Sequence, residues 1–157
     1  MEITQLLLGK ELSWIKLKFM EKVRVDVQWC DKNFGASFGE NVPGAVVFTA
    51  DTFDALQRVA KETLDFHVEG MLEDGDEVPQ WLANGDYTFE YNYLDIATML
   101  RVCEAYASLA AISRATGINQ NQLSHYATGL KRPRPAQRKR IVDGIHHIGE
   151  QLLAVGM

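Results

Sequence analysis

The stretch from Ser108 to Pro133, SLAAISRATGINQNQLSHYATGLKRP, constrains the fold more than any other part of this sequence. It predicts two short helices joined by a tight turn. Ser108 stands where its hydroxyl can accept a hydrogen bond from a free amide in the first turn of the first helix. Gly117 follows that helix, and glycine adopts the positive φ of a sharp turn without steric cost. Asn119 is the corresponding cap of the second helix, which ends at Gly129.

The apolar residues of this stretch recur at the spacing of a buried helix face. The residues expected to point inward are Ile112, Ile118, Leu123 and Tyr126. Gln122 comes three residues after Asn119, where a glutamine can complete a capping box. The polar residues left on the outer face of the second helix, near its start, are Gln120, Asn121, Ser124 and His125.

This pattern resembles the helix-turn-helix of the XRE/Cro repressor family. The four inward residues match the family's buried positions, Gly117 matches its turn glycine, and the ending YATGLKRP resembles the usual close of its second helix. Ser113 departs from the family's alanine, but serine is small enough to let the two helices cross. The resemblance implies that the second helix recognises DNA. The alternative is an ordinary helical hairpin with a polar exposed face.

The DNA-binding residues that we expect fall into two groups. Those at the start of the second helix, placed to meet base edges, are Asn119, Gln120, Asn121, Ser124 and His125. Those directly after that helix, placed to clamp phosphates, are Lys131, Arg132 and Arg134. The next basic residues are Arg138, Lys139 and Arg140. They fall on the last helix, where a solvated basic face is the simpler interpretation.

The net charge of −5 hides an uneven distribution of charged residues. Residues 1–22 hold 4 basic and 3 acidic residues, for a net charge of +1. Residues 23–92 hold 4 basic and 14 acidic residues, for −10, and residues 93–157 hold 8 basic and 4 acidic residues, for +4. Such a split predicts two modules with different partners. The basic module suits a phosphate backbone, whereas the acidic one would be repelled by nucleic acid and suits a basic protein.

The acidic module shows the period-two alternation of half-buried strands. The expected strands cover residues 23–30, 35–40, 45–50 and 87–93, with the third more buried than the two before it. Turn residues occupy positions 31–33 and 41–44. A helix that Asp51 or Thr52 caps, and that ends near Gly70, precedes the fourth strand. The predicted order is β-β-β-α-β.

That order, with the turn NVPG at residues 41–44 and the helix start TADTFDAL, resembles the HicB antitoxin family. An opening V-x-V strand and a short aromatic second strand belong to the same resemblance, which covers about residues 20–157. It implies an N-terminal domain of reduced RNase H-like fold ahead of a DNA-binding domain. It also implies a partner, a small basic RNA-cleaving toxin of the HicA type, which the acidic module would bind and block.

Residues 93–157 are expected to form an all-α domain around the helical hairpin. Asp95 is a candidate N-cap for its first helix, and Pro135 suits the first turn of its last helix. The apolar face of the first helix is expected to contain Ile96, Met99, Leu100, Cys103 and Tyr106. The last helix carries a stripe of Ile141, Ile145, Ile148 and Leu152. This stripe suits the domain core, and a share of it suits the pairing of two subunits.

No catalytic or metal-binding constellation is expected. The carboxylates that a nuclease would need are present as Asp26, Asp31, Glu40, Asp51 and Asp54. Turns, caps and an exposed strand face explain them without catalysis. His67 falls on an apolar helix face, and a helix directs His146 and His147 about 100° apart. The two cysteines, Cys30 and Cys103, are expected to be reduced and buried, and no apolar run approaches the length of a membrane span.

The sequence therefore predicts an α+β protein with an extension of unknown role over residues 1–22, a toxin-binding domain over 23–92 and a helix-turn-helix domain over 93–157. Met20 is an alternative start to Met1. The expected function is that of a cytoplasmic antitoxin, not an enzyme and without a cofactor, that also represses its own operon. It would bind double-stranded operator DNA as a homodimer or a higher even oligomer. The alternatives are a stand-alone repressor whose N-domain senses a ligand or a protein, and a degenerate nuclease.

Overall fold

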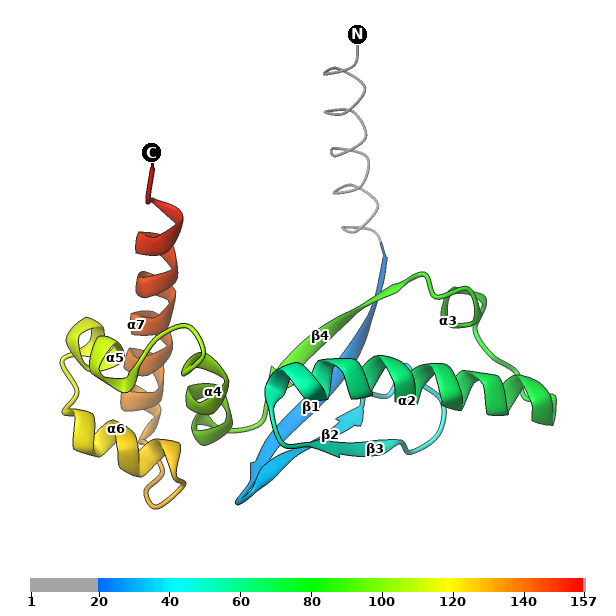
Figure 1. The fold of residues 1–157 in the computed structure, drawn as a ribbon, viewed down its shortest axis with the longest axis horizontal. Helices are drawn as coiled ribbons and strands as arrows, with labels where there is room; N and C mark the ends of the chain where they lie inside the picture. The colour runs from blue at the N-terminus through cyan, green and yellow to red at the C-terminus, as the bar shows by residue number, and fades with distance from the viewer. Residues whose placement is uncertain (1–19, 157) are drawn as a thin grey trace, which may run out of the picture.

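The computed structural model describes residues 20–156, which form a mixed α+β structure. A four-stranded sheet covered by one long helix lies beside a group of helices formed by the C-terminal part of the chain (Figure 1). In chain order the elements are β1 (Glu21–Cys30), β2 (Asn33–Phe38), β3 (Val47–Ala50), α2 (Phe53–Asp74), α3 (Gln80–Ala83), β4 (Tyr87–Tyr93), α4 (Ile96–Cys103), α5 (Leu109–Thr116), α6 (Gln120–Ala127) and α7 (Pro135–Leu153). Of the extension predicted over residues 1–22, residues 1–19 lie outside the described part.

The sheet has the strand order β3-β2-β1-β4, with β1 and β2 antiparallel, β2 and β3 antiparallel, and β4 parallel to β1. The alternation predicted for β1 is confirmed: Val23, Val25 and Val27 are fully buried, while Arg24 and Gln28 are exposed. The valines pack against the buried face of α2, which consists of Leu56, Ala60, Leu64 and Val68. Burial of these side chains is the main force that holds α2 on the sheet.

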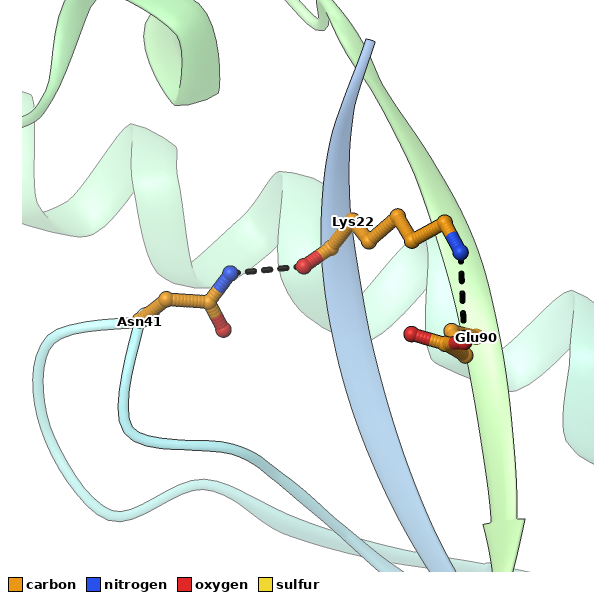
Figure 2. A network of polar contacts seen from close by, with 3 residues as sticks. All are labelled: Lys22, Asn41 and Glu90. Carbon is orange, nitrogen blue, oxygen red and sulfur yellow. Dashed lines mark hydrogen bonds and ion pairs between the residues drawn. The ribbon is translucent and has the colours of Figure 1, made fainter. Parts of the chain in front are cut away.

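The turn at residues 41–44 closes one end of the sheet and joins it to α2. Where β2 has left the ladder, the side-chain amide of Asn41 donates to the Lys22 carbonyl at 2.7 Å (Figure 2). The Lys22 ammonium lies 3.2 Å from a Glu90 carboxylate oxygen on β4, but both side chains are largely exposed and such pairs add little stability. The Pro43 carbonyl lies 2.7 Å from His67 Nε2 on α2 and accepts its hydrogen bond. His67 therefore has a structural role in the contact between the turn and the helix.

The helix over the sheet is longer than its glycines suggest. We predicted an end near Gly70, and this prediction is wrong, because α2 continues to Asp74. Gly75 is the residue that adopts the left-handed conformation, with φ 76°, and its amide bonds the Leu72 carbonyl. The short helix α3, which we did not predict, follows before β4.

Several strand boundaries also differ from the prediction. β1 begins at residue 21 rather than 23, and β2 covers residues 33–38 rather than 35–40. β3 begins at Val47 and is an exposed edge strand, so the prediction that it is more buried than β1 and β2 is wrong. Val47 is 77% exposed and only Phe48 of this strand is buried. The apolar run at residues 45–50 therefore did not predict burial, because β3 pairs with β2 on one side and, within the described part of the chain, has no strand on the other.

Helix α4 belongs to both halves of the structure. Its Thr98 is fully buried, and the Thr98 hydroxyl accepts from the Trp29 amide at 2.8 Å and donates to Asp95 Oδ1 at 2.7 Å. Val102 joins the core beneath the sheet, whereas Leu100 joins the core of the helical group. The boundary that we expected after residue 92 falls inside β4, and α4 is not confined to the helical side of it.

The helical group has its own core, and the four residues predicted to point inward from the hairpin are all buried there. From α7, Ile141 is fully buried, and Ile145 and Ile148 pack against the same core. Two predicted members are wrong: Tyr106 lies after the end of α4 and is exposed, and Leu152 is exposed on the last turn of α7.

Helices α5 and α7 cross so closely that one position tolerates only glycine. A Cβ added to Gly144 of α7 would overlap with the Thr116 Cγ2 methyl group. Thr116 cannot rotate away freely, because its hydroxyl donates to the Ile112 carbonyl at 2.7 Å and accepts from the Ile118 amide at 3.2 Å. The crossing therefore fixes the end of α5 and the turn that follows it.

We expect Gly144→Ala to destabilise the protein. Overpacking costs about 1–3 kcal/mol, which outweighs the roughly 1 kcal/mol by which alanine favours a helix over glycine. Gly149→Ala is the matched control, because nothing lies within 4 Å of a Cβ at this position of the same helix. Thermal unfolding should show a lower Tm for Gly144→Ala and a higher one for Gly149→Ala. Equal increases for both variants would contradict the close crossing.

Candidate nucleic-acid interface

The hairpin of α5 and α6 is held by the caps that the sequence predicts. The Ser108 hydroxyl accepts from the Ala111 amide at 3.2 Å, and Gly117 ends α5 with φ 69°. Asn119 Oδ1 accepts from the Asn121 amide at 2.8 Å. Each helix start and the turn between them are thus fixed by local hydrogen bonds.

Ser113, at the position where the resemblance calls for alanine, adds a further bond to the turn. Its hydroxyl donates to the Ile118 carbonyl at 2.6 Å. Because Ile118 is buried, a carbonyl without a partner there would carry a desolvation penalty. The serine therefore supports the turn that places α6 rather than weakening it.

The predicted capping box is wrong. The side-chain amide of Gln122 donates to the Tyr126 hydroxyl at 2.7 Å instead of returning to the start of α6. The Tyr126 ring is buried, and its hydroxyl needs a partner that Gln122 can supply from the preceding turn. Asn119, which we expected to contact DNA, has its side-chain oxygen engaged in the cap. Its side-chain amide nitrogen remains available for a further contact.

The polar face expected to meet base edges lies at the start of α6. Gln120 and Asn121 are exposed, and Ser124 and His125 are half-buried one turn further on. All four side chains combine hydrogen-bond donors and acceptors. Asparagine and glutamine can bond adenine with two hydrogen bonds, which makes Gln120 and Asn121 the better candidates for base recognition.

The segment after α6 turns back so that its basic residues lie at the end of that helix. Gly129 has φ 76°, and the Lys131 amide donates to the His125 carbonyl at 3.1 Å. Lys131, Arg132 and Arg134 are all exposed. The turn therefore holds together the three residues predicted to contact phosphates.

The start of α7 adds to this basic surface. Pro135 occupies the first turn, as predicted, and no acidic residue lies in that turn. The free amides of a helix start carry partial positive charge, so Arg134 and Arg138 beside them are unfavourable without an anion. A phosphate group would relieve this repulsion.

The three basic residues of α7 differ in their surroundings. Lys139 pairs with Asp143 one turn along the helix, and the Arg140 guanidinium lies against Gly117 in the hairpin turn. Arg138 instead lines an open groove of about 360 Å³. The other residues of this groove include Gln28, Asp95, Tyr126, Lys131 and Arg132. Of the three, only Arg138 lies with the predicted phosphate-binding residues.

The Asp26 carboxylate, on the central strand β1, forms hydrogen bonds within the sheet. Burial opposes ionisation of Asp26, but hydrogen bonds from Asn92 Nδ2 at 2.6 Å and Arg24 Nε at 2.8 Å outweigh it and hold the Asp26 pKa below its usual value. Across residues 20–156, no three His, Cys, Asp or Glu side chains lie close enough to hold a metal ion. The hydrogen bonds from Asn92 and Arg24 thus give the Asp26 carboxylate a structural setting.

The two cysteines have different environments. Cys103 is partly buried, and this burial raises the pKa of its thiol. Cys30 is exposed, so the prediction that it is buried is wrong. It lies at the last position of β1, on the same face of the sheet as Asp26 and Gln28, which is the face that α2 does not cover. Both thiols are free.

Comparison with protein-family models, with curated proteins and with solved structures finds no match. None of the helices in the described range is both long and apolar enough to cross a membrane. Functional inference therefore rests on the geometry and chemistry of the α5–α6 hairpin, the basic segment after it and the acidic half of the chain.

We expect Gln120→Ala to weaken binding to the cognate DNA by about 1–3 kcal/mol and to relax the preference at one base pair. The reason is the loss of a side chain that can bond a base edge with two hydrogen bonds. Gel-shift titrations on single-base variants of the bound sequence measure both effects, and Gln151→Ala, at the exposed far end of α7, is the control. Unchanged base preference in the alanine variants of Gln120, Asn121 and His125 would contradict the assignment.

Replacing Lys131, Arg132 or Arg134 by alanine should weaken binding to specific and random duplexes alike. Each lost phosphate contact should lower the slope of log affinity against log salt by about 1. Lys139→Ala is the matched control, because Lys139 is already paired with Asp143 and should change the slope much less. A variant that loses only specific binding would show that its side chain reads bases instead.

Proposed function

We propose that this protein is a cytoplasmic, HicB-type antitoxin that binds a small basic RNA-cleaving toxin and represses its own operon. The observation that carries the proposal is the combination, in one chain, of a capped helical hairpin followed by clustered basic residues with a sheet module of net charge −10. In this proposal the protein has no catalytic role. It acts by occupying two macromolecular surfaces.

The DNA-binding half of the proposal rests on the α5–α6 hairpin. Polar side chains at the start of an exposed helix can reach base edges, and the adjacent Lys131, Arg132 and Arg134 can fix the register through phosphates. One such helix reads only a few base pairs. Useful specificity therefore requires two copies on half-sites about one helical turn apart, and a homodimer or higher even oligomer on a palindromic operator follows.

The toxin-binding half rests on charge. A surface of net charge −10 is unsuited to nucleic acid and attracts a basic protein over a distance set by the salt concentration. Docking would then be fast at low salt and slower as the salt concentration rises. Because the toxin cleaves RNA in this proposal, an acidic antitoxin would compete with RNA for the same basic surface.

A second candidate is a stand-alone repressor whose N-terminal half binds a small ligand. A cleft of about 270 Å³ between the sheet, the start of α2 and α4 favours it, with Trp29, Phe34, Phe53, Arg101 and Tyr106 among its lining residues. The Arg101 guanidinium lies 4.2 Å from the centre of the Trp29 ring, and Arg101 Nε donates to the Ala127 carbonyl of α6 at 3.2 Å. A ligand that displaced Arg101 would disturb the recognition helix.

The first proposal predicts that a small basic protein is encoded beside this gene, and co-expression of the full chain with that protein tests it. We expect co-purification, relief of the toxin's effect on growth, and binding of the DNA upstream of the gene pair. The full chain is required because a cut after residue 92 would sever β4 and remove the Thr98 contact to Trp29. DNA binding without any protein partner, and with a response to small ligands, would favour the second candidate.

A further inference from the structure

The middle of α2 presents an aromatic residue to solvent. Phe66 is 78% exposed, although α2 buries four side chains of its opposite face against the sheet. Figure 1 shows α2 lying over the sheet with its outer side uncovered by any other labelled element. An exposed phenylalanine on a regular helix can serve as the anchor of an interface when a partner covers it.

Like charges surround this phenylalanine. Residues three, four and seven positions away lie near it on the same side of a helix, and here these are Glu69, Glu62 and Glu73. All three carboxylates are exposed. Within residues 20–156 the ion pair formed by α2 is that of Lys61 and Asp65, so these three have no cation within salt-bridge distance. Their mutual repulsion disfavours the helix, and a cationic partner would relieve it.

A glycine lies on the same side. Gly70 follows Phe66 by one turn in the interior of α2, where glycine is less favourable than alanine. Its φ is not positive, and nothing lies within 4 Å of a Cβ built there. The described structure therefore gives no internal reason for a glycine, whereas a closely approaching partner would supply one.

An apolar groove runs beside this side of the helix. It lies between α2 and the segment of α3, with an open volume of about 650 Å³. Val68, Leu72 and Leu82 form its apolar part, and Leu72 is exposed. Asp65, Glu69 and Glu73 also line it, together with Lys61, which pairs with Asp65. The groove thus places apolar side chains beside Glu69 and Glu73, the two carboxylates that also neighbour Phe66 on the helix.

We propose that this surface, the α2 docking face, is where a basic protein binds. We define the face by Glu62, Phe66, Glu69, Gly70, Leu72 and Glu73. Phe66 would enter an apolar pocket of the partner, the partner backbone would approach at Gly70, and lysine or arginine side chains around the pocket would pair with the carboxylates. This inference rests on the proposed function, since it makes the toxin the partner.

Charge decides between the possible occupants. A second copy of this chain on the same face would bring two sets of unpaired carboxylates together, and nucleic acid would be repelled. A basic protein has the complementary charge, and the exposed phenylalanine adds the desolvated anchor that a purely electrostatic contact lacks.

The test measures binding of the full chain to the small basic protein encoded beside its gene. Phe66→Ser should weaken binding by about 30-fold, the effect of an interface hot spot. The control Val47→Ser changes an equally exposed residue, at 77%, on the opposite face of the sheet and should leave binding unchanged. Glu69→Lys with Glu73→Lys should abolish binding, whereas the same charge change at Glu104 and Glu150 should not.

Gly70→Leu separates docking from folding. Leucine favours a helix over glycine and meets no neighbour within 4 Å at its Cβ, so the Tm should not fall. Binding should nevertheless weaken at least as much as in Phe66→Ser, because the side chain blocks close approach.

The outcomes distinguish the two proposals. If the unmodified chain does not bind the neighbouring basic protein, the proposed function and this inference both fail. If it binds, and if Phe66→Ser, Gly70→Leu and the double lysine variant bind equally well, the antitoxin proposal stands and the α2 docking face is wrong.

Discussion

One short helix, α4, determines how the two halves of this structure are joined. The Thr98 hydroxyl is fully buried, and a buried hydroxyl without partners is costly. The Thr98 hydroxyl accepts a hydrogen bond from the Trp29 amide at the end of β1 and donates one to the Asp95 carboxylate at the start of α4. Arg101 extends this connection, because it stacks on Trp29 and donates to the Ala127 carbonyl at the end of α6. The sheet therefore positions the α5–α6 hairpin through these directional contacts and through the packing of Val102 of α4 in the sheet core.

This arrangement separates the opposite charges of the chain. α2 begins near α4 and runs away from the helical group, so its carboxylates lie away from the basic segment at residues 131–134 (Figure 1). Repulsion between the acidic half and a bound duplex would then fall off with distance and salt. The proposed DNA contacts and the α2 docking face can thus be used at the same time.

The sequence predicts well those features that depend on neighbours along the chain. The caps at Ser108 and Asn119, the turn at Gly117 and the alternation of β1 all depend on residues within a few positions, and all are found. It predicts poorly what depends on distant contacts. Gly70 has the appearance of a helix end, but α2 continues to Asp74 and Leu72 lines one groove with Leu82 of α3. The edge position of β3 and the contacts of α4 with both halves likewise depend on neighbours far away in the chain. The hydrogen bond from Gln122 to Tyr126 replaces a competing bond to the start of α6. No sequence motif marks the α2 docking face that we propose. The exposure of Phe66 follows only once the buried face of the helix is known.

The most direct test of the account is hydrogen exchange of the full chain, alone, with duplex DNA from upstream of its gene, and with the small basic protein encoded beside it. Amide exchange reports local protection element by element. The account predicts that DNA protects α6 and residues 129–134 and leaves α2 unchanged, whereas the basic protein protects the amides of α2 around residues 62–73. Protection of α2 by DNA, or of α6 by the basic protein without any change in α2, would contradict the assignment of two partners to two surfaces.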